Sequence, residues 1–404
     1  MDDRQFAELA AWIAEAGLAG ESETKLVTGF CARVTALGLP LARASVLIDT
    51  LHPIYEGRLF SWQASSGETM LSEYGSSRHG EASERWRRSP FYRLVQSGEP
   101  LLRRRLDAES EPEFPVFADM AAAGMTDYVA MVNRFTAEGI IGEMDCVYSS
   151  WATDVGQGFR ETDVADLERL VPLLALAIKS ASLARIARTL VETYLGRDAG
   201  RRVLEGRIVR GTADRIEAVL WFSDLRGYTR ITDTAAPGQI IPLLNDYAEA
   251  IISAIHAAAG DVLKLMGDGT LAIFTAEDRE AACRGALAAA SAARLSVAEL
   301  NRRRSAASLP VTDMYLGLHF GEVFYGNIGS KERLDFTVVG PAVNEVSRIA
   351  ALCRSVEQPV LLSSTFASAA GEARSRLVSV GRYALRGVGR PQELFTLDPA
   401  QDSP

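Results

Sequence analysis

Hydrophobic positions along the chain change their spacing, and these changes divide it into three parts. In residues 1–160, short stretches with helical spacing stand beside stretches that alternate as strands do. The helical stretches are Phe6–Ile13 and Lys25–Leu37, and the strand-like stretches are Ala44–Ile48, Asp127–Asn133 and Gly139–Ser149. This mixture predicts an α+β domain over residues 1–160.

The second part, residues 161–208, is predicted to be mainly helical. Thr162 is expected as the N-cap, and Pro172 is expected to bend or break the helix. An apolar stripe with partly heptad spacing begins before Pro172 and continues after it. It is made of Leu167, Leu170, Val171, Leu174 and Ile178. The helix either only packs on its own domain or, as we prefer, begins there and continues as a dimeric connector.

In the third part, residues 209–398, strands and helices alternate, and residues 399–404 form a tail. The expected strands are Ile216–Leu225, Val262–Met266, Leu271–Phe274, Met314–Phe320 and Phe336–Val339. The expected helices are Ile240–Ile255, Glu280–Arg303 and Ala342–Cys353. Gly267, Asp268 and Gly269 predict a tight turn between the second and third strands.

Composition excludes several classes of protein. A formal net charge of -9 over 404 residues argues against a dedicated nucleic-acid-binding protein, so no nucleic acid is expected as a partner. The first residues lack the layout of a signal peptide and no window of 18 apolar residues occurs, so we expect no membrane span and a cytoplasmic location. The cysteines are scattered without a CxxC pair, which predicts reduced thiols and no zinc site.

Two aspartates stand where predicted strands end. Asp224 follows the first strand of the third part, and Asp268 lies in the glycine-flanked turn. Either residue alone is more often an ordinary turn or cap residue. Two such carboxylates together can share a pair of hard divalent cations, whose other ligands come from substrate phosphates. The pair therefore indicates phosphoryl chemistry with two Mg²⁺ or Mn²⁺ ions per active site.

The motifs around these aspartates resemble those of the class III adenylate/guanylate cyclases. Val219–Thr229 and Gly260–Gly269 resemble the two metal-binding motifs, Gly317–Gly329 the central strand and turn, and Phe336–Arg348 the transition-state motif of that family. The resemblance covers about residues 209–398, with the four motifs in the family's order. It implies an α+β catalytic domain with a ferredoxin-like βαββαβ core.

The resemblance also implies a role for each matching residue. Asp224 and Asp268 would hold the two metal ions, with the Leu225 carbonyl as an additional ligand. Asn344 would orient the ribose, and Arg348 would stabilise charge on the α-phosphate. Asn344 and Arg348 are four residues apart and so share one helix face.

Three further residues would bind the rest of the nucleotide. Lys264 and Thr337 fall where the family reads the purine, and Arg386 falls where many members have a triphosphate-binding lysine. A lysine donates, which suits adenine N1, and a threonine oxygen can accept from the 6-amino group, whereas guanine reverses both. Asp335, two residues before Thr337 and on the same strand face, is the alternative acceptor.

These residues together predict an adenylate cyclase that converts ATP to 3′,5′-cyclic AMP and pyrophosphate. Thr337 resembles a subgroup common in bacteria, some of whose members respond to bicarbonate. In the family the active site is shared, and we expect the aspartates and Lys264 of one subunit to face Thr337, Asn344 and Arg348 of another in a homodimer. The alternatives are a guanylate cyclase, or a catalytically silent homologue that binds nucleotide.

The first two parts are expected to regulate the third. The α+β pattern of residues 1–160, followed directly by a helix, resembles the GAF-type sensors fused to such cyclases. Thr193–Gly206 resembles the transducing element that precedes many catalytic domains of this family. An unknown small-molecule effector is expected at the N-terminal domain, although its aromatic residues are more often core residues than pocket residues.

Overall fold

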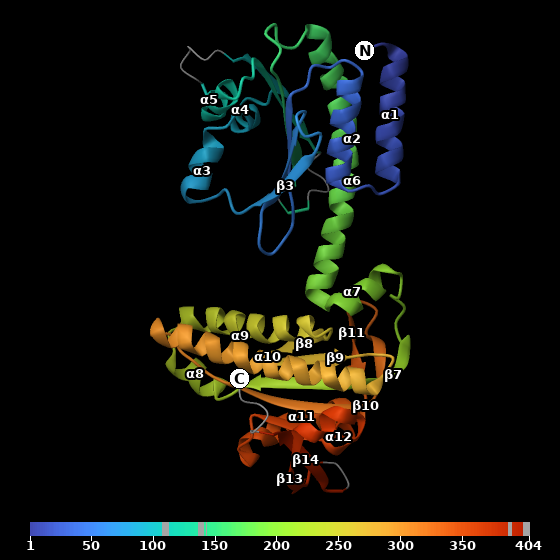
Figure 1. Ribbon diagram of the computed structural model, residues 1–404, viewed down its shortest axis with the longest axis vertical. Helices are drawn as coiled ribbons and strands as arrows, with labels where there is room; N and C mark the ends of the chain where they lie inside the picture. The colour runs from blue at the N-terminus through green and yellow to red at the C-terminus, as the bar shows by residue number, and fades with distance from the viewer. Residues whose placement is uncertain (107–112, 136–140, 143, 387–389, 399–404) are drawn as a thin grey trace. The chain divides into compact units, whose positions relative to one another are not determined.

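The computed structural model describes residues 1–106, 113–135, 141–142, 144–386 and 390–398. The chain forms two compact units, Met1–Leu190 and Val191–Pro404 (Figure 1). The boundary falls inside the predicted connector, residues 161–208, so the end of that segment belongs to the second unit.

The first unit contains an antiparallel sheet in the order β3-β2-β1-β6-β5-β4. Its strands are β1 (Arg43–Asp49), β2 (Gly57–Gln63), β3 (Thr69–Tyr74), β4 (Leu101–Arg105), β5 (Asp127–Arg134) and β6 (Cys146–Thr153). Its helices are α1 (Asp3–Leu18), α2 (Glu23–Ala36), α3 (Gly80–Arg87), α4 (Pro90–Ser97), α5 (Pro115–Ala122) and α6 (Glu161–Leu195). The α+β prediction for this unit is confirmed, and residues 139, 140 and 143 of the expected last strand lie outside the described residues.

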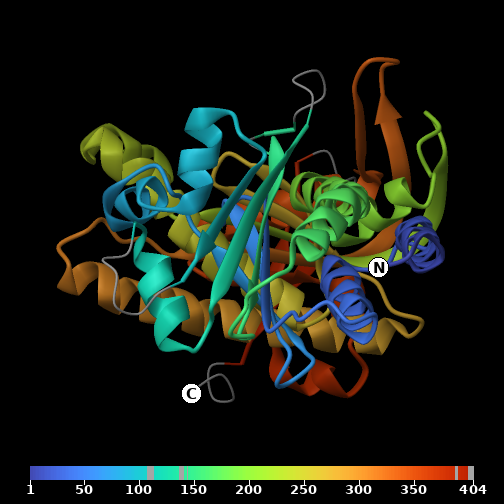
Figure 2. The same cartoon turned by 90° about the horizontal axis from the view of Figure 1, so that it is seen from above.

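The two faces of this sheet carry separate hydrophobic cores. Helices α1, α2 and α6 cover one face, and α3, α4 and α5 lie on the other (Figures 1 and 2). The aromatic residues Trp62, Phe117 and Tyr128 are buried in these cores. These three side chains therefore contribute to packing.

Helix α6 is continuous over 35 residues with Pro172 inside it, so the expected break is wrong. Leu170, Val171 and Leu174, on both sides of the proline, are buried in one core and hold the helix together despite the missing amide donor. The helix begins at Glu161, and the Asp163 carboxylate accepts the backbone N–H of Arg160 at 2.8 Å. Thr162 therefore lies inside the first turn and is not the N-cap.

By length and composition alone, α6 is also apolar enough to cross a membrane. It is the one such helix among the described residues, and 44% of its most apolar window is buried inside the structure. A core helix of a folded unit passes the same test. This observation therefore gives only weak evidence for a membrane span.

The second unit is built on the predicted βαββαβ arrangement. Its central strands lie in the order β10-β7-β9-β8, and all neighbours are antiparallel. The strands are β7 (Ala213–Leu225), β8 (Asp261–Met266), β9 (Gly269–Phe274), β10 (Met314–Gly329), β11 (Leu334–Val339), β12 (Val360–Ser363), β13 (Leu377–Tyr383) and β14 (Gln392–Leu397). The α-helices are α7 (Arg197–Leu204), α8 (Tyr228–Thr234), α9 (Pro237–Ala257), α10 (Arg279–Ala306), α11 (Pro341–Val356) and α12 (Ser364–Ala369).

Alternate residues of β7 enter two cores on opposite faces of the sheet. Val219 and Trp221 pack with α9, α10 and α12, whereas Ala218 and Leu220 pack with α7, α11 and β11. This alternation follows from the two-residue period of a strand. Strand β7 is thus buried on both sides in the middle of the sheet, and its end is held in a fixed place.

Strand β10 is longer than the sequence suggested. The stretch Gly326–Gly329 was expected as a turn, but it continues the strand and pairs with β11. A Cβ on Gly326 would lie 2.1 Å from the Thr212 carbonyl oxygen, so the glycine allows a close approach of two backbones. The pairing sets Gly326 opposite Thr337 on β11.

Candidate active site

Asp224 and Asp268 lie side by side at one end of the central sheet. Asp224 is the next-to-last residue of β7, and Asp268 lies in the turn between β8 and β9, after Gly267 with φ of 65°. The backbone N–H of Leu225 donates to Asp268 Oδ2 at 3.3 Å. A Cβ on Gly269 would lie 3.3 Å from the Ser223 carbonyl oxygen, so a glycine there keeps the turn close to β7.

The two carboxylates are held together against their mutual repulsion. Partial removal from water, and next the hydrogen bond and negative charge of Asp268, raise the pKa of Asp224 to about 6. A divalent cation between them would remove this cost, because it neutralises both charges. The described residues hold no cluster of three or more His, Cys, Asp and Glu, so such a cation would take its remaining ligands from backbone, water or substrate phosphates.

Lys264 forms an ion pair with Asp335 of the same chain. Asp335 and Thr337 lie on one face of β11, opposite the buried Phe336 and Val338. Both partners of the ion pair are nearly half exposed. Lys264 therefore stands beside β11 of its own chain, the strand that carries Asp335 and Thr337.

Asn344 and Arg348 lie one turn apart on α11. The opposite side of this helix is buried through Ala342, Val346 and Ile349, so Asn344 is left exposed and Arg348 half-buried. This spacing confirms that the two residues share a helix face.

Arg386 is exposed and follows the buried Leu385, and its neighbour Gly387 lies outside the described residues. The candidates thus form three groups within one chain. The first is the two aspartates with Leu225, the second is Lys264 with β11, and the third is Asn344 with Arg348 on α11. Arg386 belongs to none of them. Among the described residues, no hydrogen bond or ion pair links one group to another. The sequence predicted Asp335 only as the alternative acceptor to Thr337. Its two-residue spacing from Thr337 was the signal that both side chains lie on one face of the strand.

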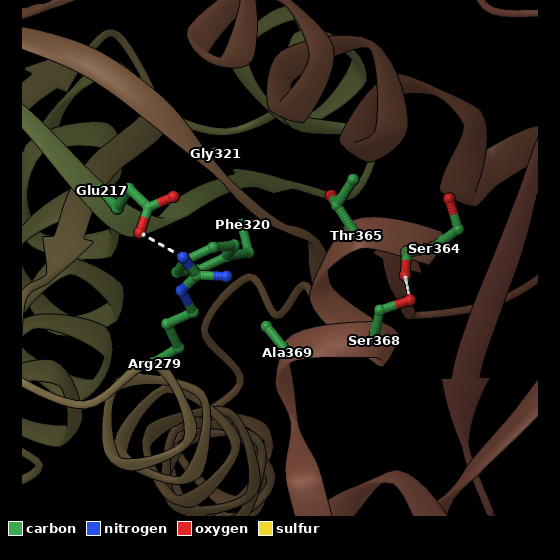
Figure 3. Close-up of a pocket in the computed structure, with 8 residues that line it drawn as sticks. All are labelled: Glu217, Arg279, Phe320, Gly321, Ser364, Thr365, Ser368 and Ala369. Carbon is green, nitrogen blue, oxygen red and sulfur yellow. Dashed lines mark hydrogen bonds and ion pairs between the residues drawn. The ribbon is translucent and has the colours of Figure 1, made fainter.

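A separate cavity of about 420 Å³ lies near the other end of β7 (Figure 3). Glu217 of β7 pairs with Arg279 of α10 at 3.1 Å, and Phe320 and Gly321 of β10 form another part of its wall. The hydroxyl of Ser368 on α12 donates to the Ser364 carbonyl at 2.9 Å. None of the candidate residues lines this cavity, so it is no part of the candidate active site.

The comparisons with known proteins agree with this geometry. Residues 212–398 match the family described as "Adenylate and Guanylate cyclase catalytic domain". This segment is therefore a class III nucleotide cyclase catalytic domain, the class of domain that the predicted motifs indicated.

Relatives and solved structures give the range of similarity. Uncharacterized proteins of Mycobacterium tuberculosis (strain CDC 1551 / Oshkosh) and Mycobacterium bovis (strain ATCC BAA-935 / AF2122/97) are each 30% identical over 237 residues, which is 58% of this chain and 40% and 42% of theirs. The chain thus spans less than half the length of these curated relatives. The guanylyl cyclase Cya2 is 29% identical, with 46% of this chain and 93% of that chain covered and a TM-score of 0.41. The adenylyl cyclase CyaB from P. aeruginosa is 22% identical, with 48% and 100% covered and a TM-score of 0.44.

The aspartate pair leads to a first prediction. Replacing Asp268 with asparagine should abolish Mn²⁺ binding and cyclase activity, because one carboxylate alone holds hard cations weakly. The melting temperature should stay near that of the unchanged protein, since a half-exposed turn carboxylate contributes little packing and its loss removes the repulsion with Asp224. Calorimetric Mn²⁺ titration and thermal unfolding test this, with Asp233→Asn on the exposed side of α8 as the control. Undiminished Mn²⁺ binding in Asp268→Asn would show that the cations bind elsewhere.

Proposed function

We propose that this protein is an adenylate cyclase that forms 3′,5′-cyclic AMP and pyrophosphate from ATP. The observation that carries the proposal is the pairing of Asp224 with Asp268 at the strand ends of a cyclase catalytic domain. A cytoplasmic location is part of the proposal, because most of the apolar stripe of α6 is already buried in the first unit.

The reaction is an attack of the ribose 3′-oxygen on the α-phosphorus, with pyrophosphate as the leaving group. Bound Mg²⁺ or Mn²⁺ supplies Lewis-acid chemistry at the 3′-hydroxyl and at the triphosphate. Asp224 and Asp268 hold these cations, and the Leu225 carbonyl is available as a further ligand. Asn344 orients the ribose, and Arg348 stabilises the charge that develops on the α-phosphate in the transition state. Arg386 supplies positive charge for the triphosphate.

The choice of ATP rests on Lys264. Its ammonium group is a pure donor and suits adenine N1, while Thr337 or Asp335 accepts from the 6-amino group. In the nucleotide-free chain Asp335 is already paired with Lys264, so adenine enters a site whose donor is held in place. Guanine presents a donor at N1 and an acceptor at O6, which would leave Lys264 facing a donor.

A second prediction tests the nucleotide. Purified protein with Mn²⁺ should form cyclic AMP from ATP at least tenfold more efficiently than cyclic GMP from GTP, because a wrong donor–acceptor pairing leaves buried polar groups unpaired. Lys264→Glu should lower this preference, whereas Lys25→Glu on α2 of the first unit makes the same charge change outside the cyclase domain and should leave it unchanged. Preferential cyclic GMP formation would establish that the protein is a guanylate cyclase. No product from either nucleotide would establish that it is a catalytically silent homologue.

We further propose that the active site forms between two copies of the chain. Among the described residues of one chain, no hydrogen bond or ion pair joins the aspartate pair to Lys264 or to Arg348, although the proposed reaction needs all of them around one nucleotide. A symmetric homodimer brings the aspartates of one copy to the other groups of its partner and makes two equivalent sites. The Lys264–Asp335 pair supports the assignment of Lys264 to the same proposed half-site as Thr337, Asn344 and Arg348.

Mixed mutants test this division as a third prediction. Asp224→Ala and Arg348→Ala should each be inactive, and an equal mixture should recover about a quarter of wild-type activity, since half of the dimers are mixed and each then has one native site. Lys264→Ala should recover activity with Asp224→Ala and not with Arg348→Ala. The reverse pattern would place Lys264 with the aspartates. No recovery in any pair, with mixed dimers demonstrated by mass, would contradict a shared site.

Residues 1–160 are proposed to be a GAF-like sensor that binds a small-molecule effector. A cavity of about 410 Å³ lies in this unit between α3, α4 and α5, with Phe91 and Tyr128 in its wall together with Arg85 and Arg88. A cavity of this size, with apolar walls and a few charged groups, is suited to a small ligand. The continuous helix α6 leaves this unit and continues into the second one.

A chain that begins at Val191 provides the fourth prediction. It should keep the metal and ATP requirements, because α7 and the whole cyclase sheet remain, but it should lose any response to a ligand of the first unit. Cyclic AMP formation by the full chain and the shortened chain is compared for each compound that alters the full chain's rate. An equal response in the shortened chain would mean that the signal enters through the cyclase domain itself.

A further inference from the structure

Helix α7 and the glycine before it contact β8, which carries Lys264, and β10, which pairs with the strand that carries Asp335 and Thr337. Before α7, Gly196 approaches β8 so closely that a Cβ there would lie 2.3 Å from the Val262 carbonyl oxygen. The pairing of β8 with β9 has an irregular register between Val262 and Lys264. A bulge of this kind changes the direction in which the next side chain points. The contact from α7 therefore falls where the strand sets the direction of Lys264.

The second contact of α7 is with Tyr325 on β10. The Arg202 guanidinium lies over the Tyr325 ring, 5.0 Å from its centre. Arg202 is fixed by ion pairs with Asp198 at 2.7 Å and with Asp214 at 3.0 Å. Asp198 also accepts from Arg201 at 2.6 Å, and these hydrogen bonds lower its pKa although its partial burial raises it. The Tyr325 ring is therefore in contact with a cation, the Arg202 guanidinium, that moves together with α7.

The far side of the same ring meets β11. Tyr325 is 1% exposed, and its ring packs edge-on against Phe336 with centres 4.9 Å apart and planes at 89°. Phe336 stands between Asp335 and Thr337, whose side chains lie on the other face of β11. A shift of the Tyr325 ring must move Phe336, because a close-packed core transmits displacements. Asp335 and Thr337 would then move with their strand.

The hydroxyl of Tyr325 adds a further observation. It is buried and has no hydrogen-bond partner of good geometry among the described residues, although Asp198 lies nearby. Buried hydroxyl groups are normally paired, so this one contributes little to the contact. What Tyr325 provides is its ring, which contacts both Arg202 and Phe336.

We propose that Tyr325 is a positioning residue that links α7 to the base-reading strands, so that movement of the connector changes how the site binds and distinguishes purines. This inference rests on the proposed function for the identity of the base-reading residues. It names the route by which regulation would reach them: the contact of Gly196 with β8 sets Lys264, and the Arg202–Tyr325–Phe336 stack sets β11. The first contact acts on the strand that carries Lys264, and the second acts on the strand that carries its ion-pair partner, Asp335.

The test uses the full-length chain and 3′-deoxy-ATP and 3′-deoxy-GTP, which bind without cyclising. Tyr325→Leu and Asp198→Asn should change the ratio of the two dissociation constants by about fivefold or more, a typical size for coupling between sites. Tyr325→Phe keeps both ring contacts and should stay near the wild-type ratio. Glu205→Gln is the matched control, because Glu205 pairs with Arg201 on the exposed side of α7 and does not reach the ring.

Hydrogen exchange separates this inference from the proposed function. Exchange in residues 261–266 and 334–339 should become faster in Asp198→Asn and Tyr325→Leu but not in Glu205→Gln, whether or not any nucleotide binds. If wild-type protein binds neither nucleotide, the proposed function fails and the exchange result alone decides the inference. Unchanged exchange in both strands, or a lower melting temperature with an unchanged ratio of dissociation constants, would overturn the positioning role.

Discussion

The repulsion between Asp224 and Asp268 is the constraint around which the second unit is built. Two carboxylates in contact cost free energy in the absence of a cation, and partial burial, together with the hydrogen bond and negative charge of Asp268, raises the pKa of Asp224. The rest of the domain supplies what keeps them together. Strand β7 pairs along 13 residues with β10 and is packed on both faces, so its end cannot move away from the neighbouring turn. A rigid, electrostatically unfavourable pair of this kind is suited to the divalent cations that the proposed reaction requires.

The other charged groups of the candidate site are arranged in a different way. Lys264 has a partner, Asp335. Arg348 is half-buried on α11, and the uncharged Asn344 one turn before it is exposed. Neither Lys264 nor Arg348 is fully buried, so the nucleotide-free chain loses little free energy by holding them. Among the described residues, no hydrogen bond or ion pair joins the aspartate pair to Lys264 or to Arg348. This arrangement is consistent with the proposed active site shared between two copies of the chain.

Sequence patterns predicted β7, β8, β9, β11, α9, α10 and α11 of the second unit to within a few residues. They left α8, α12, β12, β13 and β14 unpredicted. The errors occurred where a local signal was outweighed by packing. Gly326 and Gly329 indicate a turn when read locally, but a neighbouring backbone and the pairing with β11 make them strand residues. Pro172 indicates a bend or a break, but buried leucines on both sides keep α6 continuous through it. In the first unit, weaker patterns left β2, β3 and the short helices unpredicted.

The sequence by itself determined the kind of residue available for chemistry: two aspartates after strands, one lysine, and an asparagine and arginine one helical turn apart. Spacing along one strand or one helix is enough for this, since such residues share a face through local backbone geometry alone. Only the tertiary structure decided that Asp224 touches Asp268 and that Lys264 pairs with Asp335, 71 residues away. Those contacts depend on the order of strands in the sheet and on a bulge and a close backbone approach. Sheet order is set by the packing of the whole unit, and no local pattern of residues contains it.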